Sequence, residues 1–165
     1  MAEEPIQRLR MTLLMTPSMA NFSGNVHGGA ILKQLDEVAY ACASRYAGTY
    51  VVTLSVDQVV FRQPIHVGEL VTFAAAVNYT GRTSMEVGIK VTTENVHTRE
   101  VRHTNSCYFT MVAIGEDGNS VPVPEWVPQT AIEIGRHRAA QHRRELRAEM
   151  DRRMSEIRTD RTKAG

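Results

Sequence analysis

The sequence predicts an α+β fold in which an antiparallel sheet wraps around one long helix. A mostly apolar helical pattern covers residues 30–47, and after Gly48 the pattern changes to alternation with a period of two residues. Four alternating runs then follow one another with turn signals between them, which is typical of an antiparallel meander. Because one helix precedes these strands, the sheet is expected to bury its apolar face against that helix.

The first expected elements are a short strand over residues 8–16, a polar loop from Asn21 to Gly29, and the helix. Steps of about 100° per residue place one continuous apolar arc on the helix. So wide an arc predicts a deeply packed helix with Asp36 at the edge of the arc. Asp36 is therefore expected to be partly buried against Leu32, Ala39, Tyr40 and Ala43. The arc itself consists of Ile31, Leu32, Leu35, Val38, Ala39, Cys42, Ala43 and Tyr46.

The strands are predicted from alternating apolar residues. These are Val52, Leu54 and Val56; Val71, Phe73, Ala75, Val77 and Tyr79; Met85, Val87, Ile89 and Val91; and Cys107, Phe109, Met111 and Ala113. Prolines at 122, 124 and 128 mark a connector, and residues 131–163 are expected to form a charged helix. The predicted organisation is one domain over residues 8–125 and a connector with a basic helical tail over residues 126–165.

Composition excludes several classes of protein. The 165 residues carry a formal net charge of +1 and are 42% hydrophobic, which suits one globular domain with a tail and predicts neither nucleic-acid nor membrane partners. Residues 131–165 are basic, with a net charge of +4, and the remainder has a net charge of −3. The chain shows no signal-peptide layout, so a soluble cytoplasmic protein is expected. Cys42 and Cys107 are expected to be buried free thiols, without metal or redox spacing.

The polar loop and the start of the helix supply chemical groups that suit acyl transfer. The first N–H groups of a helix are unpaired and lie at the positive end of its dipole. Gly28 and Gly29 have no side chains to shield these donors, so a substrate oxygen can approach them. Asp36 adds a carboxylate further along the helix. These groups are the parts needed to hydrolyse an activated acyl group.

Several motifs in order resemble the acyl-CoA thioesterases of the cytosolic acyl-CoA hydrolase type, which have the hotdog fold. The resemblance covers roughly residues 8–125. It is carried by residues 20–29 (ANFSGNVHGG), 35–39 (LDEVA), 52–57 (VTLSVD), 61–64 (FRQP), 81–87 (GRTSMEV) and 107–113 (CYFTMVA).

The resemblance implies an enzyme that splits acyl-CoA into free CoA and a fatty acid without a metal or other cofactor, since CoA is part of substrate and product. Members pair by joining their sheets and assemble further, commonly as trimers of dimers, so a homo-oligomer is expected that is at least a dimer and is a hexamer if it follows the common pattern. The site lies between two protomers, where Asn21 of one faces Asp36 of the other.

Each catalytic candidate has two interpretations. A carboxylate at Asp36 can take a proton from water or attack the carbonyl to give a mixed anhydride. It can also be a surface carboxylate paired with Lys33. An amide at Asn21 can hold water or polarise the thioester carbonyl. It can also be a turn residue, although Asn25 is nearer the helix.

The substrate-binding candidates also have more than one interpretation. His27, Gly28 and Gly29 are expected to form the oxyanion-binding part, with backbone N–H donors from Gly28 or Gly29. His27 is considered less as a proton-transfer catalyst than as a residue that shapes the loop. Gly81, Arg82, Thr83 and Ser84 suit CoA phosphates or form an ordinary hairpin turn. Arg62 and Arg102 are weaker candidates for the same phosphates.

Two other functions compete with hydrolysis. One is a hotdog β-hydroxyacyl-thioester dehydratase or hydratase that uses His27 with Asp36. The other is a non-catalytic acyl-CoA-binding regulator whose basic tail contacts DNA. The tail is expected to be a solvated or oligomer-capping helix, with a second possibility of assisting CoA phosphates. Neither the preferred acyl chain length nor regulation by nucleotides follows from the sequence.

Overall fold

A computed structural model describes residues 6–163 of the chain. The described chain divides into two compact units, one up to Trp126 and one from Val127 onward, and each is described by itself. The elements in chain order are β1 (Arg8–Leu14), the 3-10 helix η1 (Pro17–Met19), α1 (Gly28–Ala47), β2 (Tyr50–Val56), β3 (Glu69–Thr80), β4 (Ser84–Asn95), β5 (Val101–Ile114) and α2 (Ala131–Lys163).

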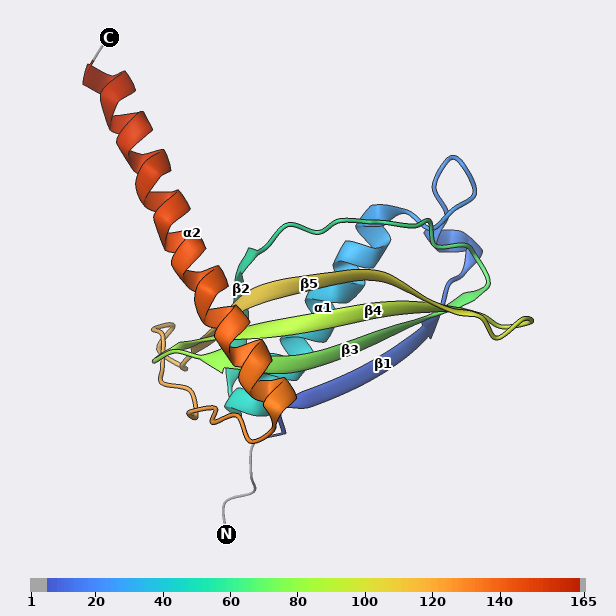
Figure 1. Cartoon of the computed structure of the whole chain (residues 1–165), viewed down its shortest axis with the longest axis horizontal. Coiled ribbons are helices and arrows are strands. Elements are labelled where there is room, and N and C mark those ends of the chain that lie inside the picture. Colours follow the sequence, from blue (N-terminus) through green and yellow to red (C-terminus); the bar gives the residue numbers. More distant parts are fainter. Residues whose placement is uncertain (1–5, 164–165) are drawn as a thin grey trace. The chain divides into compact units, whose positions relative to one another are not determined.

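The five strands form one sheet in the order β1-β3-β4-β5-β2, and every neighbouring pair is antiparallel. The strands β3, β4 and β5 form a meander, and β1 and β2 lie at its two edges. α1 lies across one face of the sheet and contacts all five strands (Figure 1). The predicted α+β fold, a sheet around a central helix, is therefore confirmed.

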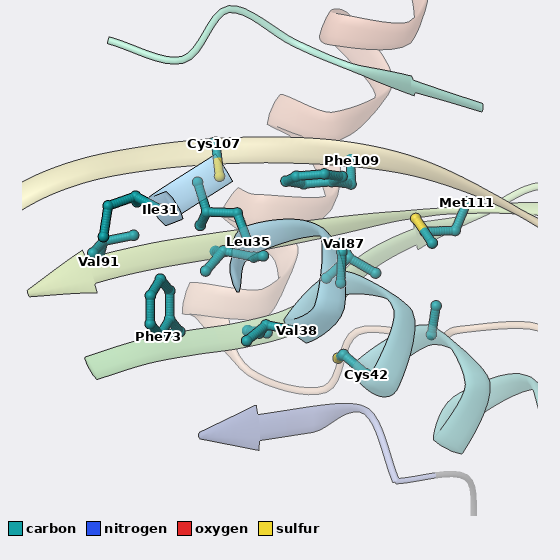
Figure 2. Packing of buried hydrophobic residues seen from close by; sticks show 14 of the residues in the cluster. Ile31, Leu35, Val38, Cys42, Phe73, Val87, Val91, Cys107, Phe109 and Met111 are labelled. Carbon is teal, nitrogen blue, oxygen red and sulfur yellow. The ribbon is translucent and has the colours of Figure 1, made fainter. Parts of the chain in front are cut away.

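The core lies between α1 and the sheet. Fully burying a large apolar side chain contributes about 1.5–3 kcal/mol, so this cluster fixes the rotation of α1 about its axis. That rotation decides which helix residues face away from the sheet. Figure 2 shows the cluster, in which Ile31, Leu35, Val38 and Cys42 of α1 meet Phe73, Val87, Val91, Cys107, Phe109 and Met111 of the strands.

α1 begins two residues earlier than predicted and ends at Ala47 as predicted. It begins at Gly28 because His27 caps it, with the His27 ring accepting a hydrogen bond from the Gly29 N–H. It ends because Gly48 adopts a φ of 68°, in the left-handed region that favours glycine, and its N–H bonds the Ser44 carbonyl. The polar loop therefore leads directly into the first turn.

One expectation about α1 is wrong. Leu32 is 41% exposed and Tyr40 is 43% exposed, and Asp36 between them is exposed as well. The predicted partial burial of Asp36 therefore does not occur within one chain. The sheet covers only the part of the apolar arc around Leu35, and residues spaced by four, such as these three, share the outer side of the helix.

The second unit contains α2, whose bounds match the predicted helix over residues 131–163. Thr130 and Glu133 form a capping box at its start. The Glu133 N–H donates to Thr130 Oγ1 at 3.3 Å, and the Thr130 N–H donates to Glu133 Oε2 at 2.9 Å. Within residues 6–163, no helix is long and apolar enough to cross a bilayer.

Candidate functional site

Asp36 on α1 and Thr53 on β2 are joined by a hydrogen bond. The Thr53 hydroxyl donates to Asp36 Oδ1 at 2.6 Å, and both side chains are exposed in the single chain. Thr53 pairs with Met111 of β5, and a β-bulge follows it before Ser55. This bond holds the carboxylate in one orientation and leaves Oδ2 facing away from Thr53 as an acceptor. Lys33, the alternative partner of Asp36, lies 3.7 Å from Glu37 instead.

Asn21 organises the loop before α1. Its Oδ1 accepts hydrogen bonds from the N–H groups of Ser23 at 2.9 Å and Asn25 at 3.1 Å. The Asn21 N–H also bonds the Asn25 carbonyl at 2.6 Å, and Gly24 has a φ of 79° at the turn. Because the oxygen faces these two donors, the orientation of the amide is determined by the network. The Asn21 NH₂ group consequently faces away from these two donors.

The first turn of α1 leaves one backbone donor unused. The Gly29 N–H donates to His27 Nδ1 at 2.9 Å. The N–H groups of Ala30 and Ile31 both donate to the His27 carbonyl, at 2.9 and 3.3 Å. Among the described residues no hydrogen bond uses the Gly28 N–H. A substrate oxygen at this helix start would therefore meet Gly28 first.

The segment between β2 and β3 reaches the start of α1 (Figure 1). The Val26 N–H bonds the Ile65 carbonyl at 2.8 Å, and Asn25 Oδ1 lies 2.8 Å from His66 Nδ1. A Cβ added to Gly28 would lie 3.7 Å from the Phe61 ring. Phe61 thus lines the approach to the unused Gly28 donor.

Asp36 and Gly28 of one protomer are too far apart to act on one carbonyl group. Asp36 lies eight residues after Gly28 in α1, and eight steps of 1.5 Å separate them by about 12 Å along the axis. A carbonyl bond is only about 1.2 Å long. Within a single chain, these two groups therefore cannot contact the same small reacting group.

An exposed apolar surface surrounds Asp36. We call it the β2-edge surface and define it by side chains that are 41–67% exposed: Leu32, Tyr40, Tyr50, Leu54 and Val56. The Tyr40 and Tyr50 rings contact each other edge to face at a centroid distance of 6.2 Å. Because β2 ends the sheet, its outer edge has no strand partner within the described chain. An unpaired edge with large apolar side chains is typical of a surface that another chain covers.

The CoA candidates lie at opposite ends of the sheet. Gly81, Arg82, Thr83 and Ser84 span the hairpin between β3 and β4, where the Gly81 N–H bonds the Ser84 carbonyl at 2.7 Å. The Arg82 side chain is exposed. Arg62 is also exposed, but it follows Phe61 and so lies toward the start of α1. The 12 residues of β3 span about 35 Å between these ends. One protomer therefore does not bring Arg62 and Arg82 together.

Arg102, a weaker candidate, has structural partners. Its guanidinium lies 2.5 Å from Glu69 Oε1 and donates to Gln63 Oε1 at 3.2 Å. Glu69 Oε2 accepts from the His66 N–H at 2.9 Å. Arg102 thus ties the segment before β3 to β5.

The two cysteines are free thiols and both are buried, as predicted. Burial raises the pKa of Cys42 and of Cys107 to about 12, with Arg45 lowering the first and Asp57 raising the second to a smaller extent. The thiol form therefore persists at physiological pH. In the part of the chain that the structure describes, no three His, Cys, Asp or Glu residues are grouped as metal ligands.

Thr53 is a candidate site residue that the sequence alone does not indicate. It appears there only as a polar position in an alternating strand. Its spacing from Asp36 carries no periodic signal, because the contact depends on how α1 crosses β2. The sequence gives only one local sign of this contact. A hydroxyl residue lies in the first strand after the helix that carries Asp36.

A family model and similar solved structures indicate the same family of proteins for this chain. The model of the thioesterase superfamily matches residues 23–99. Protein VdlD of Helicobacter pylori is 53% identical over 140 residues, which cover 85% of this chain and 80% of that protein. A crystal structure of an apo-hexameric acyl-CoA thioesterase is 38% identical, with a TM-score of 0.84, and covers 87% of this chain and 92% of that chain.

A further similar structure is an acyl-CoA hydrolase from Staphylococcus aureus in complex with butyryl-CoA, CoA and CoA disulfide. It is 28% identical, has a TM-score of 0.84, and covers 98% of both chains. Mutants of that hydrolase have been solved with an Asn, an Asp or a Thr replaced by Ala. In that protein the Asp follows the Asn by 15 residues and the Thr follows the Asp by 17, the same spacings as among Asn21, Asp36 and Thr53.

Proposed function

This chain belongs to the acyl-CoA thioesterases of the thioesterase superfamily, and we propose that two copies of it form each site that hydrolyses acyl-CoA to CoA and a fatty acid. Asp36 and Thr53 come from one protomer, and Asn21 and Gly28 come from the other. The separation of about 12 Å between Asp36 and Gly28 in a single chain is the observation that carries this proposal. The hexameric state of a similar thioesterase supports a homo-oligomer.

The β2-edge surface is the proposed contact between the two protomers. In a two-fold dimer the same patch of each copy meets itself, so β2 would pair with β2 and extend the sheet. The two α1 helices then run antiparallel, which brings the start of one helix toward the middle of the other. The exposed Leu32 and Tyr40, on either side of Asp36, become covered in this arrangement. Burial of Asp36, which does not occur in one chain, would thus come from the partner.

In this arrangement Asp36 acts on water. Thr53 holds Oδ1, so Oδ2 accepts the proton of a water whose oxygen attacks the thioester carbon. When the C–S bond breaks, the same proton passes to the sulfur and CoA leaves as a thiol. Direct attack by Asp36 to form a mixed anhydride, which water then hydrolyses, uses the same contacts.

Asn21 and Gly28 are proposed to stabilise the oxyanion. The Gly28 N–H is the unused donor at the helix start, and the Asn21 NH₂ group is a second donor directed outward from the loop. Donors aimed at the developing negative charge lower the barrier most when they are held in place beforehand. His27 is proposed to hold these donors in place as the cap of α1 and not to carry a proton, since its Nδ1 accepts the Gly29 N–H.

Arg82 is proposed to bind CoA phosphates on the protomer that supplies Asp36. Thr53, Met111 and Met85 lie in one row across β2, β5 and β4. Arg82 therefore lies about 10 Å across the sheet and about 10 Å along it from Thr53, a span that suits the pantetheine arm of CoA. Arg62, near the start of α1, would belong to the other protomer.

Hydrolysis of a saturated acyl-CoA tests the function directly. Release of CoA, followed with a thiol reagent, is expected from the wild-type protein and is expected to be lost in Asp36→Asn, while the fold is kept. A panel of esters of increasing chain length would then give the preferred acyl group. Absence of CoA release with any saturated ester would contradict hydrolysis. A dehydratase would instead act only on β-hydroxyacyl or enoyl esters, and a binding module would bind CoA without turnover.

A further inference from the structure

The loop that carries Asn21 is anchored by the side chain of His66. His66 Nδ1 lies 2.8 Å from Asn25 Oδ1, and because an amide oxygen only accepts, Nδ1 must carry the proton of this hydrogen bond. Asn25 in turn donates its N–H to Asn21 Oδ1 at 3.1 Å, and its carbonyl accepts the Asn21 N–H at 2.6 Å. The contact from His66 therefore reaches the Asn21 side chain through a single residue.

The backbone of His66 is held by Glu69, the first residue of β3. Glu69 Oε2 accepts the His66 N–H at 2.9 Å, and the Glu69 N–H donates to the His66 carbonyl at 3.2 Å. Glu69 is only 5% exposed, and its other oxygen, Oε1, lies 2.5 Å from the Arg102 guanidinium of β5. Because both oxygens of this buried carboxylate are bonded, it has little freedom to rotate. His66 is thus fixed to the sheet.

The anchor can be removed without disturbing the core. The His66 side chain is exposed, so its truncation leaves no buried cavity. The loop also keeps a backbone contact of its own, since the Val26 N–H bonds the Ile65 carbonyl at 2.8 Å. Residues 22–24, which lie between Asn21 and Asn25, are all exposed. The His66 contact therefore restrains the part of the loop next to the Asn21 amide.

We infer that His66 is a positioning residue that holds the Asn21 amide in place for the oxyanion. This inference deepens the proposed function and rests on it, since Asn21 must act as a donor. Oxyanion donors are most effective when they are held in place before the negative charge develops, and a misplacement of about 1 Å can cost about 10²-fold in rate. His66 acts through Asn25 and Asn21 and touches no reacting atom.

Steady-state kinetics of the full-length protein test this role. His66→Ala removes the anchor and is expected to lower kcat about tenfold with little change in KM, because a donor to the transition state is loosened. His66→Asn places an amide N–H at the position of Nδ1 and is expected to restore most of kcat. The matched control is His97→Ala, at an exposed histidine in the turn between β4 and β5, which should keep the wild-type kcat. A wild-type kcat in His66→Ala, or equal losses in His66→Ala and His66→Asn, would overturn the inference.

Subunit mixing tests which side of the shared site His66 serves. A His66→Ala chain supplies an intact Asp36, so after exchange with Asp36→Ala chains each mixed dimer contains one fully intact site. If His66→Ala alone keeps a tenth of the activity, exchange should raise the activity of this mixture about fivefold. With Asn21→Ala chains the two defects lie on the same side of the site, and exchange should leave the activity unchanged. A general loss of folding in His66→Ala would not produce this difference.

Failure of the inference can be told apart from failure of the proposed function. Exchange between Asn21→Ala and Asp36→Ala chains tests the shared site alone, and no recovery there contradicts the proposed function. The kinetic comparison of His66→Ala with His66→Asn then decides the role of His66 by itself. Recovery in that pair, without a rise when His66→Ala is mixed with Asp36→Ala, would overturn only the inference. A rise with Asn21→Ala chains would place His66 on the Asp36 side and overturn it as well.

Discussion

Gly28→Pro removes the proposed oxyanion donor and little else. Proline is favoured at the first position of a helix, because the N–H that it lacks is not used there. The residue before a proline must be extended, and His27 already has a φ of −66° and a ψ of 131°. The other donors of the first turn keep their partners, since Gly29, Ala30 and Ile31 all bond to His27.

The expected loss follows from the number of donors removed. Deleting one oxyanion donor from an acyl-transfer site typically costs about 2.7–4 kcal/mol, or about 10²–10³ in kcat. The Gly28 N–H is a single donor, and Asn21 remains beside it, so the lower part of that range is expected. Stability should hardly change, because proline at this position suits the helix.

Steady-state hydrolysis of a saturated acyl-CoA and thermal unfolding would be measured together. Gly28→Ala is the matched control, because it keeps the N–H and its Cβ would lie 3.7 Å from Phe61, an ordinary contact. We expect Gly28→Pro to lose at least about a hundredfold in kcat and Gly28→Ala to lose far less. A folded Gly28→Pro enzyme with a kcat near that of Gly28→Ala would refute the assignment of this donor.

Three further predictions concern other groups. Thr53→Val removes the 2.6 Å hydrogen bond to Asp36 and should lower kcat by about tenfold to a hundredfold, since hydrogen bonds to charged groups are worth about 1.5–3 kcal/mol. Thr53→Ser, which keeps a hydroxyl, should retain most of the wild-type kcat. A normal kcat in Thr53→Val would exclude Thr53 from positioning Asp36. Arg82→Ala should raise KM for acyl-CoA more than it lowers kcat, whereas an unchanged KM would remove Arg82 from the CoA site. Burial raises the pKa of Cys42 and Cys107 from 9.0 to about 12. The contribution of each buried thiol to the free energy of unfolding is therefore complete below pH 9 and is lost as pH rises toward 12, by up to about 1.4 kcal/mol per thiol and pH unit. Alkaline unfolding curves of Cys→Ala variants with a pH dependence as steep as that of the wild type would contradict this.

The fold follows from patterns that are local in the sequence. Alternation along residues 85–91 and 107–113 requires strands with one buried face, and the apolar arc of residues 31–46 requires a helix against them. The position of Asp36 on the helix was also predictable from residue spacing. Its exposure was not, because the sheet covers a narrower arc than the apolar residues occupy, and Leu32 lies outside it.

The site depends on contacts that no local pattern encodes. Thr53 reaches Asp36 because β2 crosses beside α1 at the sheet edge. The choice between Gly28 and Gly29 depends on where the His27 ring points, since the ring occupies the Gly29 N–H. Such contacts are set by packing between elements, and a sequence shows only the residue types that permit them.

The most direct test of a site shared between two protomers uses two inactive variants. Asn21→Ala and Asp36→Ala are each expected to be folded and inactive. When the two variants are mixed and subunits exchange, each mixed dimer contains one site with both residues intact. Half of the dimers are mixed, and each of these has one working site of two. Activity should therefore return to about a quarter of the wild-type level. Continued inactivity after subunit exchange has been verified, for example by mass spectrometry of tagged chains, would contradict the shared site.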